Sequence, residues 1–204
     1  MPHPPAADPL DLLSADPVLR ELIAAGPPIE PRPQEDLYFA LLRSVISQQL
    51  STKVARVITG RFCALFPEGY PQPDLVAGTP DQTLRQVGLS GQKLGYIRNI
   101  VAFQQQGELE HDRLAALADE DLIRHLTQIK GVGRWTAEMI LMFALDRPDV
   151  LPVDDLGIRN AMVRHYGLPE TGKTLTARME AVAEAWRPFR TLACKYLWQS
   201  LDNG

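Results

Sequence analysis

Two adjacent acids, Asp154 and Asp155, open the segment "LPVDDLGIRNAMVR". A carboxylate held rigidly at one point can orient or deprotonate a water molecule, or stabilise a positive charge that develops in a transition state. The residues that follow the acids have helical spacing, so either carboxylate could instead cap the helix and satisfy its N-terminal dipole. The pair therefore contains a candidate catalytic acid, and helix capping is the alternative for both residues.

The stretch "QIKGVGRWTAEMI" places Gly131 and Gly133 inside an otherwise helix-forming region. The sequence predicts a helix that ends at Ile129, a turn through the two glycines, and a second helix from Arg134. The glycines allow positive φ and close backbone approach. Amides of such a turn, together with the N-terminus of the second helix, can bind an anion such as a phosphate. An ordinary helical hairpin with a glycine cap is the alternative for these glycines alone.

The composition is that of a globular protein with a sizeable core. The chain has 204 residues, of which 45% are hydrophobic and 23% charged. No apolar run approaches the ~18 residues of a membrane span, and no secretory signal is recognised at the start, so a cytoplasmic protein is expected. Cys63 and Cys194 have no metal-ligand spacing, which argues against an iron–sulfur cluster.

The charge is unevenly distributed, although the net charge is −4. Windows 41–62, 85–99, 122–136 and 156–169 contain no acid and hold 12 of the 21 basic residues in 66 positions. These windows predict a basic face that could meet a phosphate backbone. The residues are Arg43, Lys53, Arg56, Arg61, Arg85, Lys93, Arg98, Arg124, Lys130, Arg134, Arg159 and Arg164.

Hydrophobic periodicity predicts an all-α protein with eight to ten short helices and no strands. Residues 1–35 are rich in proline and are expected to form an extended arm with one short helix. Residues 36–204 are expected to form the main domain, with the hairpin at about 122–145. Ser90 is predicted to cap a helix, and the polar stretch Ser47–Thr52 to separate two others.

The hairpin, followed after 24 residues by Asp155, resembles the helix–hairpin–helix DNA glycosylases, the family that includes endonuclease III. Within it, the chain is most similar to the 3-methyladenine DNA glycosylase II branch. The resemblance covers about residues 36–200 and depends on "RSVISQQLST", "GLSGQKLGYI", "IKGVGRWTAEMIL" with "LPVDDLGIRNAMVR", and "AWRPFRTLACKYLW". It implies two helical lobes with the active site in the cleft between them. Bacterial relatives of this branch can have an additional N-terminal β-lobe, and none is expected here because the segment before residue 36 is too short to form one.

The resemblance selects between the two acids. In the family, the catalytic aspartate is followed three residues later by an apolar residue and nine residues later by an arginine. Asp155 meets both conditions, with Ile158 and Arg164, whereas Asp154 meets neither. The resemblance therefore implies that Asp155 is the catalytic residue and that the reaction is hydrolytic removal of an alkylated base from DNA.

Aromatic residues complete the implied base pocket. Trp135 occupies the position where bifunctional relatives have a lysine nucleophile, so an enzyme without strand-cleaving activity is expected. Trp135 and Trp198 would stack on the extruded base and attract a cationic one. Leu156 and Met139 stand where some relatives have aromatic residues. Core packing is the alternative for both tryptophans.

The remaining implied roles concern DNA. Gln49 would be the wedge that fills the gap left by a flipped nucleotide, or else part of a plain turn, and Gln48 would face inward to the backbone. The expected phosphate contacts are Lys130, Gly131, Gly133 and Arg134. Carbonyls of Thr127, Ile129 and Val132 would bind Na⁺ or K⁺ when DNA is present, and no cofactor is expected for catalysis.

The partner implied is damaged duplex DNA, with no membrane and with the protein acting as a monomer. Two other functions stay open from the sequence. One is a non-catalytic helix–hairpin–helix DNA-binding module, and the other is a glycosylase for a different lesion such as uracil or hypoxanthine.

Overall fold

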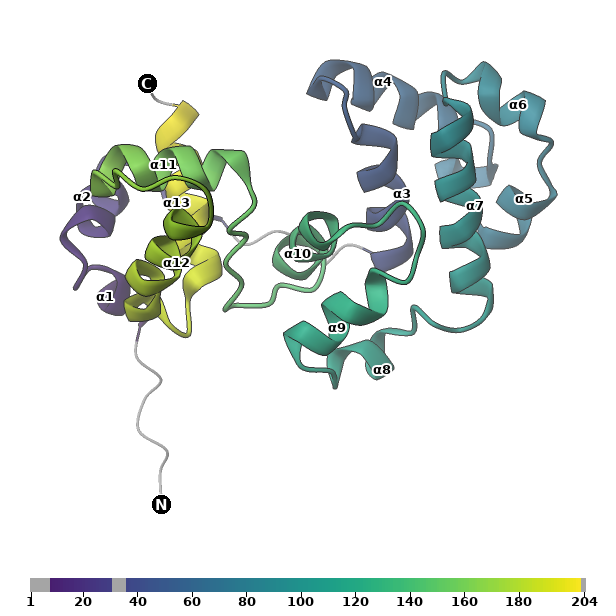
Figure 1. Cartoon of the computed structure of the whole chain (residues 1–204). Helices are drawn as coiled ribbons and strands as arrows, with labels where there is room; N and C mark the ends of the chain where they lie inside the picture. The colour runs from purple at the N-terminus through teal and green to yellow at the C-terminus, as the bar shows by residue number, and fades with distance from the viewer. Residues whose placement is uncertain (1–7, 31–35, 203–204) are drawn as a thin grey trace. The chain divides into compact units, whose positions relative to one another are not determined.

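The computed structural model describes residues 8–30 and 36–202, and within those ranges all regular secondary structure is helical, with no strand (Figure 1). This confirms the all-α prediction. Expectations that fall on residues 1–7, 31–35 and 203–204 lie outside the described residues. The described part has thirteen α-helices and two 3-10 helices, so the prediction of eight to ten was too low. Helices of one or two turns, such as α5 and α8, are too short to give a periodic signal.

The chain divides into two units, one made of Gln34–Leu145 and the other of Met1–Pro33 with Asp146–Gly204. The first unit contains α3 (Leu37–Ser47), α4 (Thr52–Cys63), η1 (Pro67–Gly69), α5 (Pro73–Gly78), α6 (Asp81–Gln86), α7 (Gly91–Gln105), α8 (His111–Ala115), α9 (Asp119–Leu126) and α10 (Arg134–Phe143). The second contains α1 (Pro9–Leu13), α2 (Pro17–Ala25), α11 (Leu156–Tyr166), α12 (Gly172–Ala183), η2 (Glu184–Trp186) and α13 (Arg190–Asp202).

Helix α3 is the centre of the first unit. It packs against α4, α7 and α10, and α10 packs in turn against α9. Its side chains Leu41, Val45 and Ile46 are fully buried. Helix α7 starts at the predicted cap, because the Ser90 hydroxyl accepts a hydrogen bond from the Lys93 amide at 3.2 Å. The hairpin helices α9 and α10 are thus attached to the same core as the loop that follows α3.

Helix α13 is the centre of the second unit, where it packs against α11 and α2. Helix α11 ends at Gly167, whose φ of 61° is the left-handed conformation of a glycine helix cap. Of the whole described part, no helix is long and apolar enough to cross a membrane.

The N-terminal segment differs from the expected arm with one helix, because it forms two helices, α1 and α2. Each begins with an aspartate cap followed by a proline, which the proline-rich composition concealed. Asp16 caps α2 through Oδ1, while its Oδ2 accepts hydrogen bonds from the Tyr166 hydroxyl at 2.9 Å and the Trp186 indole at 3.0 Å. The segment is therefore an integral part of the second unit.

Candidate nucleic-acid and catalytic site

The turn of the hairpin in the first unit begins earlier than predicted, because α9 ends at Leu126 and not at Ile129. Residues 127–133 form the turn, in which the Val132 amide donates to the Ile129 carbonyl at 2.9 Å. Ile129 and Val132 bury their side chains at 2% and 4% exposure. These two apolar anchors hold the turn in place, so its backbone groups are presented in a fixed arrangement.

Gly131 is required by both conformation and space. Its φ of +106° is in the region that side chains rarely adopt. A Cβ at this position would also overlap the ring of Tyr96, which lies directly against the Gly131 backbone. Tyr96 in α7 therefore supports the hairpin turn.

Gly133, unlike Gly131, does not have positive φ. It caps α10 with φ −89° and ψ 172°, an extended conformation that any residue can adopt. A Cβ built on Gly133 would meet nothing within 4 Å. The glycine therefore leaves open space beside the first turn of α10, where the amide groups lack helical partners.

Arg134 is already engaged within the protein. Its guanidinium forms hydrogen bonds with Glu120 at 2.5 and 3.0 Å and with buried Glu138 at 2.9 Å. The hydrogen bonds from Arg134 hold the pKa of Glu120 below its usual range. Arg134 thus connects α9 to α10. The sequence analysis expected it to contact phosphate and did not predict this connection. Lys130, by contrast, is exposed at the turn.

The loop after α3 is attached to the hairpin. The Gln48 side-chain amide donates to the Gly131 carbonyl at 3.1 Å, which confirms the expectation that Gln48 faces the backbone. Gln49 is exposed, and its φ of 59° makes it one of the few non-glycine residues with left-handed backbone. Lys93 Nζ donates to the Ile46 carbonyl at 2.6 Å, and burial lowers the pKa of this lysine. The hairpin therefore holds the loop at Gln48, and Lys93 holds the end of α3 just before it.

Trp135 and Met139 lie on α10, directly after the hairpin. Trp135 is 43% exposed and Met139 is partly buried, so neither is a core residue of this unit. Both are in the first unit, together with Gln49 and the hairpin, whereas Asp155, Leu156 and Trp198 are in the second.

Asp155 caps α11. Its Oδ1 accepts a hydrogen bond from the Ile158 amide at 2.8 Å, as expected for a cap. Its neighbour Asp154 is 65% exposed, with the nearest guanidinium nitrogen of Arg159 at 3.9 Å. The two acids therefore differ: the carboxylate of Asp155 is fixed by the helix, and that of Asp154 faces solvent.

Trp198 on α13 makes a contact that the sequence reasoning missed. Its indole Nε1 donates a hydrogen bond to the same Oδ1 of Asp155 at 2.8 Å. Two donors from two helices thus converge on one carboxylate oxygen. Next to this pair, Leu156 exposes 70% of its surface. The structure brings Asp155 and Trp198 together, with an apolar side chain exposed beside them.

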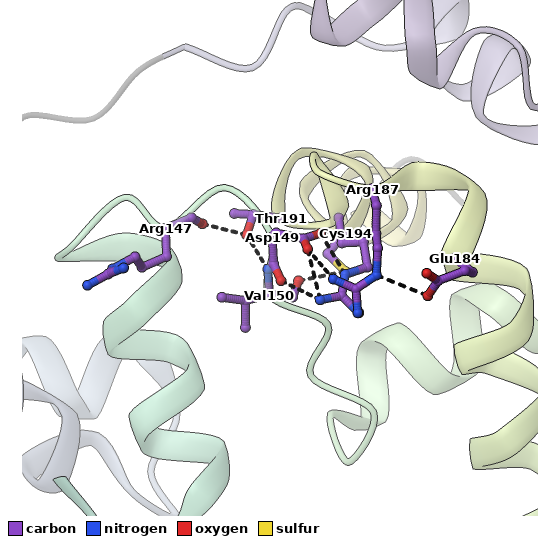
Figure 2. Close-up of polar contacts among 8 residues, drawn as sticks. Arg147, Asp149, Val150, Glu184, Arg187, Thr191 and Cys194 are labelled. Carbon is purple, nitrogen blue, oxygen red and sulfur yellow. Dashed lines mark hydrogen bonds and ion pairs between the residues drawn. The ribbon is translucent and has the colours of Figure 1, made fainter. Parts of the chain in front are cut away.

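The segment that leads to Asp155 is anchored to the start of α13 (Figure 2). The Thr191 hydroxyl donates to the Arg147 carbonyl at 2.6 Å and accepts from the Val150 amide at 3.0 Å. The Asp149 carboxylate accepts hydrogen bonds from Arg187 at 2.5 Å and from Arg190 at 2.6 Å. Since Trp198 lies on the same helix, α13 determines both where the segment approaches and how the Asp155 carboxylate is held.

Several basic residues of the acid-free windows form contacts within the protein. Besides Lys93 and Arg134, Arg98 donates hydrogen bonds to Asp81 at 2.7 Å and to the carbonyls of residues 76, 77 and 79. Arg124 pairs with Asp121 at 2.8 Å. Several other basic residues of these windows are exposed, namely Lys53, Arg56, Arg61, Arg85, Lys130 and Arg164. Part of the positive charge of these windows is therefore paired within the protein.

Comparison with known proteins identifies the class. A family model described as "HhH-GPD superfamily base excision DNA repair protein" matches residues 42–188. The hairpin and the Asp155 segment both lie within this match. The chain therefore belongs to the HhH-GPD superfamily of base excision DNA repair proteins.

Individual relatives agree with this assignment. "DNA-3-methyladenine glycosylase 1" of Schizosaccharomyces pombe is 37% identical over 169 residues, which are 82% of this chain and 73% of the relative. A putative DNA-3-methyladenine glycosylase of Bacillus subtilis is 34% identical over 81% of this chain, which spans only 59% of that relative's length.

Solved structures resemble the chain over almost its whole length. The S. pombe 3-methyladenine DNA glycosylase in complex with abasic DNA has a TM-score of 0.84 at 34% identity, covering 95% of this chain and 96% of that one. A DNA-3-methyladenine glycosidase from Bacillus halodurans has a TM-score of 0.83 at 34% identity, with coverage of 95% and 89%.

Proposed function

We propose that the protein is a monofunctional DNA glycosylase that flips alkylated bases of the 3-methyladenine type out of duplex DNA and removes them by hydrolysis. The observation that carries the proposal is the Asp155 carboxylate, held at the start of α11 by the Ile158 amide and the Trp198 indole. Membership of a base excision repair superfamily and the names of the relatives support the same reaction.

The chemistry needs one fixed carboxylate. Cleavage of the N-glycosidic bond develops positive charge on C1′ and O4′ of the deoxyribose. The Asp155 carboxylate stabilises this charge and orients the attacking water. The water oxygen forms the new bond to C1′, the base departs with the electrons of the old bond, and the proton of the water passes to Asp155 or to solvent. The product is an abasic site.

The leaving base needs little help from the protein. A purine alkylated on a ring nitrogen is cationic in the nucleotide, and it departs as a neutral molecule without a general acid. Electron-rich indole faces attract such a base through cation–π contacts, worth roughly 0.5–2 kcal/mol. Trp135 and Trp198 would serve this purpose, with Leu156 and Met139 as apolar pocket walls.

Trp135 also limits the reaction to hydrolysis. Formation of a Schiff base at C1′ requires an amine nucleophile, and an indole at this position cannot provide one. The DNA strand should therefore remain intact after base release. Borohydride reduction during turnover should trap no covalent enzyme–DNA adduct.

DNA would be held through the hairpin. Backbone amides near Gly131 and Gly133 would bind a phosphate together with Lys130, and Arg134 would contribute mainly through the shape of the hairpin. Carbonyls of Thr127, Ile129 and Val132 would bind a monovalent cation at that phosphate, and the Ile129 carbonyl would do so with its second lone pair, since it already accepts from the Val132 amide. Gln49 at the loop tip would enter the base stack.

An excision assay tests the proposal. Duplexes with 3-methyladenine, 7-methylguanine, ethenoadenine, hypoxanthine or uracil are incubated with excess protein, and the released base and the intact abasic strand are quantified. Fastest release of the cationic methylpurines is expected. Release of uracil alone would indicate a glycosylase for another lesion, and binding without any release would indicate a non-catalytic DNA-binding module.

A further inference from the structure

Gly157, the second residue of α11, lies against the Asp155–Trp198 pair. A Cβ built on Gly157 would lie 2.9 Å from both Cδ1 and Nε1 of Trp198 and 3.0 Å from Oδ1 of Asp155. All three atoms belong to the hydrogen bond or border it directly. Side chains do not approach other atoms so closely, so any residue larger than glycine would displace the indole or the carboxylate.

Backbone conformation does not explain this glycine. Gly157 is inside α11, and it is not one of the glycines with positive φ. Alanine is the better helix former at such a position. The reason for glycine must therefore be sought in the space that its missing side chain leaves.

We propose that Gly157 is a positioning residue whose missing side chain allows the edge of the Trp198 indole to reach Asp155. The inference depends on the proposed function, because it assigns a purpose to the carboxylate geometry. Asp155 cannot retreat freely, since its Oδ1 is also bound to the Ile158 amide at 2.8 Å. The backbone that carries Trp198 is held as well, since its neighbour Leu197 on α13 is fully buried, so a methyl group at position 157 would push the indole away rather than shift the helix.

A methyl group at position 157 therefore separates Nε1 of Trp198 from Oδ1 of Asp155. The carboxylate keeps its helix cap but loses the second donor. Loss of the indole donor weakens the restraint on the direction of the carboxylate. Loss of a hydrogen bond to a charged group slows a reaction that depends on it by about ten- to a hundredfold.

The test compares Gly157→Ala with Gly60→Ala as the matched control. Gly60 is also a helical glycine, in α4, but a Cβ there meets nothing within 4 Å. Both variants should fold. Gly157→Ala should lower the single-turnover rate of 3-methyladenine release by about ten- to a hundredfold, and Gly60→Ala should leave the rate unchanged. A Gly157→Ala rate equal to that of the wild type would overturn the inference.

A second readout does not depend on activity. The protein has three tryptophans, so ¹⁵N labelling gives three indole N–H signals, of which that of Trp198 is identified by its absence in Trp198→Phe. In Gly157→Ala this signal should move and exchange faster with solvent, while the signals of Trp135 and Trp186 stay in place. An unchanged Trp198 signal would contradict the inference. If the wild type releases no base, the proposed function fails, and the NMR result still decides the role of Gly157.

A double variant separates a specific effect from general damage. If Gly157 acts through the indole, adding Gly157→Ala to Trp198→Phe should cost less than about threefold in rate beyond the single change, because the two residues act as a unit. Full additivity would contradict this. If Gly157→Ala alone failed to fold, recovery of folding when Trp198→Ala is added would support crowding against the indole, because the whole ring is then gone, and continued failure would contradict it.

Discussion

The Trp198 indole and the Ile158 amide both donate to one oxygen of Asp155, at 2.8 Å each. The two donors come from different helices, α13 and α11, so the direction of the carboxylate depends on how these helices pack. Trp198 was expected to be a wall for the flipped base, and its hydrogen bond adds a second role that acts through Asp155. The two roles have different consequences for mutation.

Trp198→Phe keeps an aromatic ring but removes the N–H donor. If the hydrogen bond matters, single-turnover release should fall by about 1.5–3 kcal/mol in transition-state terms. The fractional loss should be equal for 3-methyladenine and for neutral hypoxanthine, because the carboxylate serves both reactions. Trp198→Ala should lose more on the cationic base, by roughly a further 1 kcal/mol, since the π face is then also missing. A Phe variant with unchanged rates would leave only the role of a wall.

Lys130 and Arg134 should respond differently to substitution, although both were predicted phosphate contacts. Lys130→Ala should weaken DNA binding and make the slope of log K against log salt smaller by about 1, because one phosphate contact is lost. Arg134→Ala should mainly lower stability, by about 2–4 kcal/mol, since it removes a partner of Glu138, which is 2% exposed. Urea unfolding and salt-dependent binding measure the two effects. A stable Arg134→Ala with the larger change in slope would reverse the assignment.

The sequence pattern predicted the features that depend on residues close together in the chain. The 3.6-residue period gave the all-α class, and the Ser90 cap and the inward-facing Gln48 were confirmed. Short helices that begin at a proline were not predicted, because one or two turns are too short to show a hydrophobic period. The extended backbone of Gly133 could not be predicted, because glycine allows both signs of φ, and the type of residue does not select between them.

Contacts between distant residues could not be predicted from pattern. Arg134 and Glu120 form a hydrogen bond across 14 positions of the sequence. The hydrogen bond from Trp198 to Asp155 spans 43 positions, and that from Trp186 to Asp16 spans 170. Spacing carries no information about such pairs, because helix packing brings them together. The family resemblance could select Asp155 over Asp154 but could not show what holds its carboxylate.

Gln49→Gly tests the wedge, because glycine accepts the left-handed φ of 59° and so preserves the loop backbone. Release of a base from a fully paired duplex should slow by on the order of tenfold, since nothing fills the space of the flipped nucleotide. The loss should be smaller when the lesion is opposite a mismatched base, which flips at lower cost. Equal losses in both duplexes would argue against a wedge.

Asp16→Ala tests whether the N-terminal helices are part of the second unit. The change removes the α2 cap and the acceptor for Tyr166 and Trp186, so stability should fall by about 2–4 kcal/mol. Asp8→Ala is the matched control, because Asp8 caps α1 at an exposed site through one backbone amide. It should cost about 1 kcal/mol or less. Equal unfolding free energies for the two variants would show that the Asp16 contacts contribute little.

The most direct measurement is single-turnover release of 3-methyladenine from a duplex by the wild type, Asp155→Asn and Asp154→Asn. Asparagine retains a side-chain oxygen for the α11 cap, so folding and duplex binding should persist in both variants. The Asp155→Asn rate should fall by roughly three orders of magnitude, because the negative charge that stabilises the sugar cation is gone. Asp154→Asn should stay within about threefold of the wild type, since its exposed carboxylate is screened by solvent. Wild-type release by Asp155→Asn, or the larger loss in Asp154→Asn, would contradict the assignment of the catalytic carboxylate.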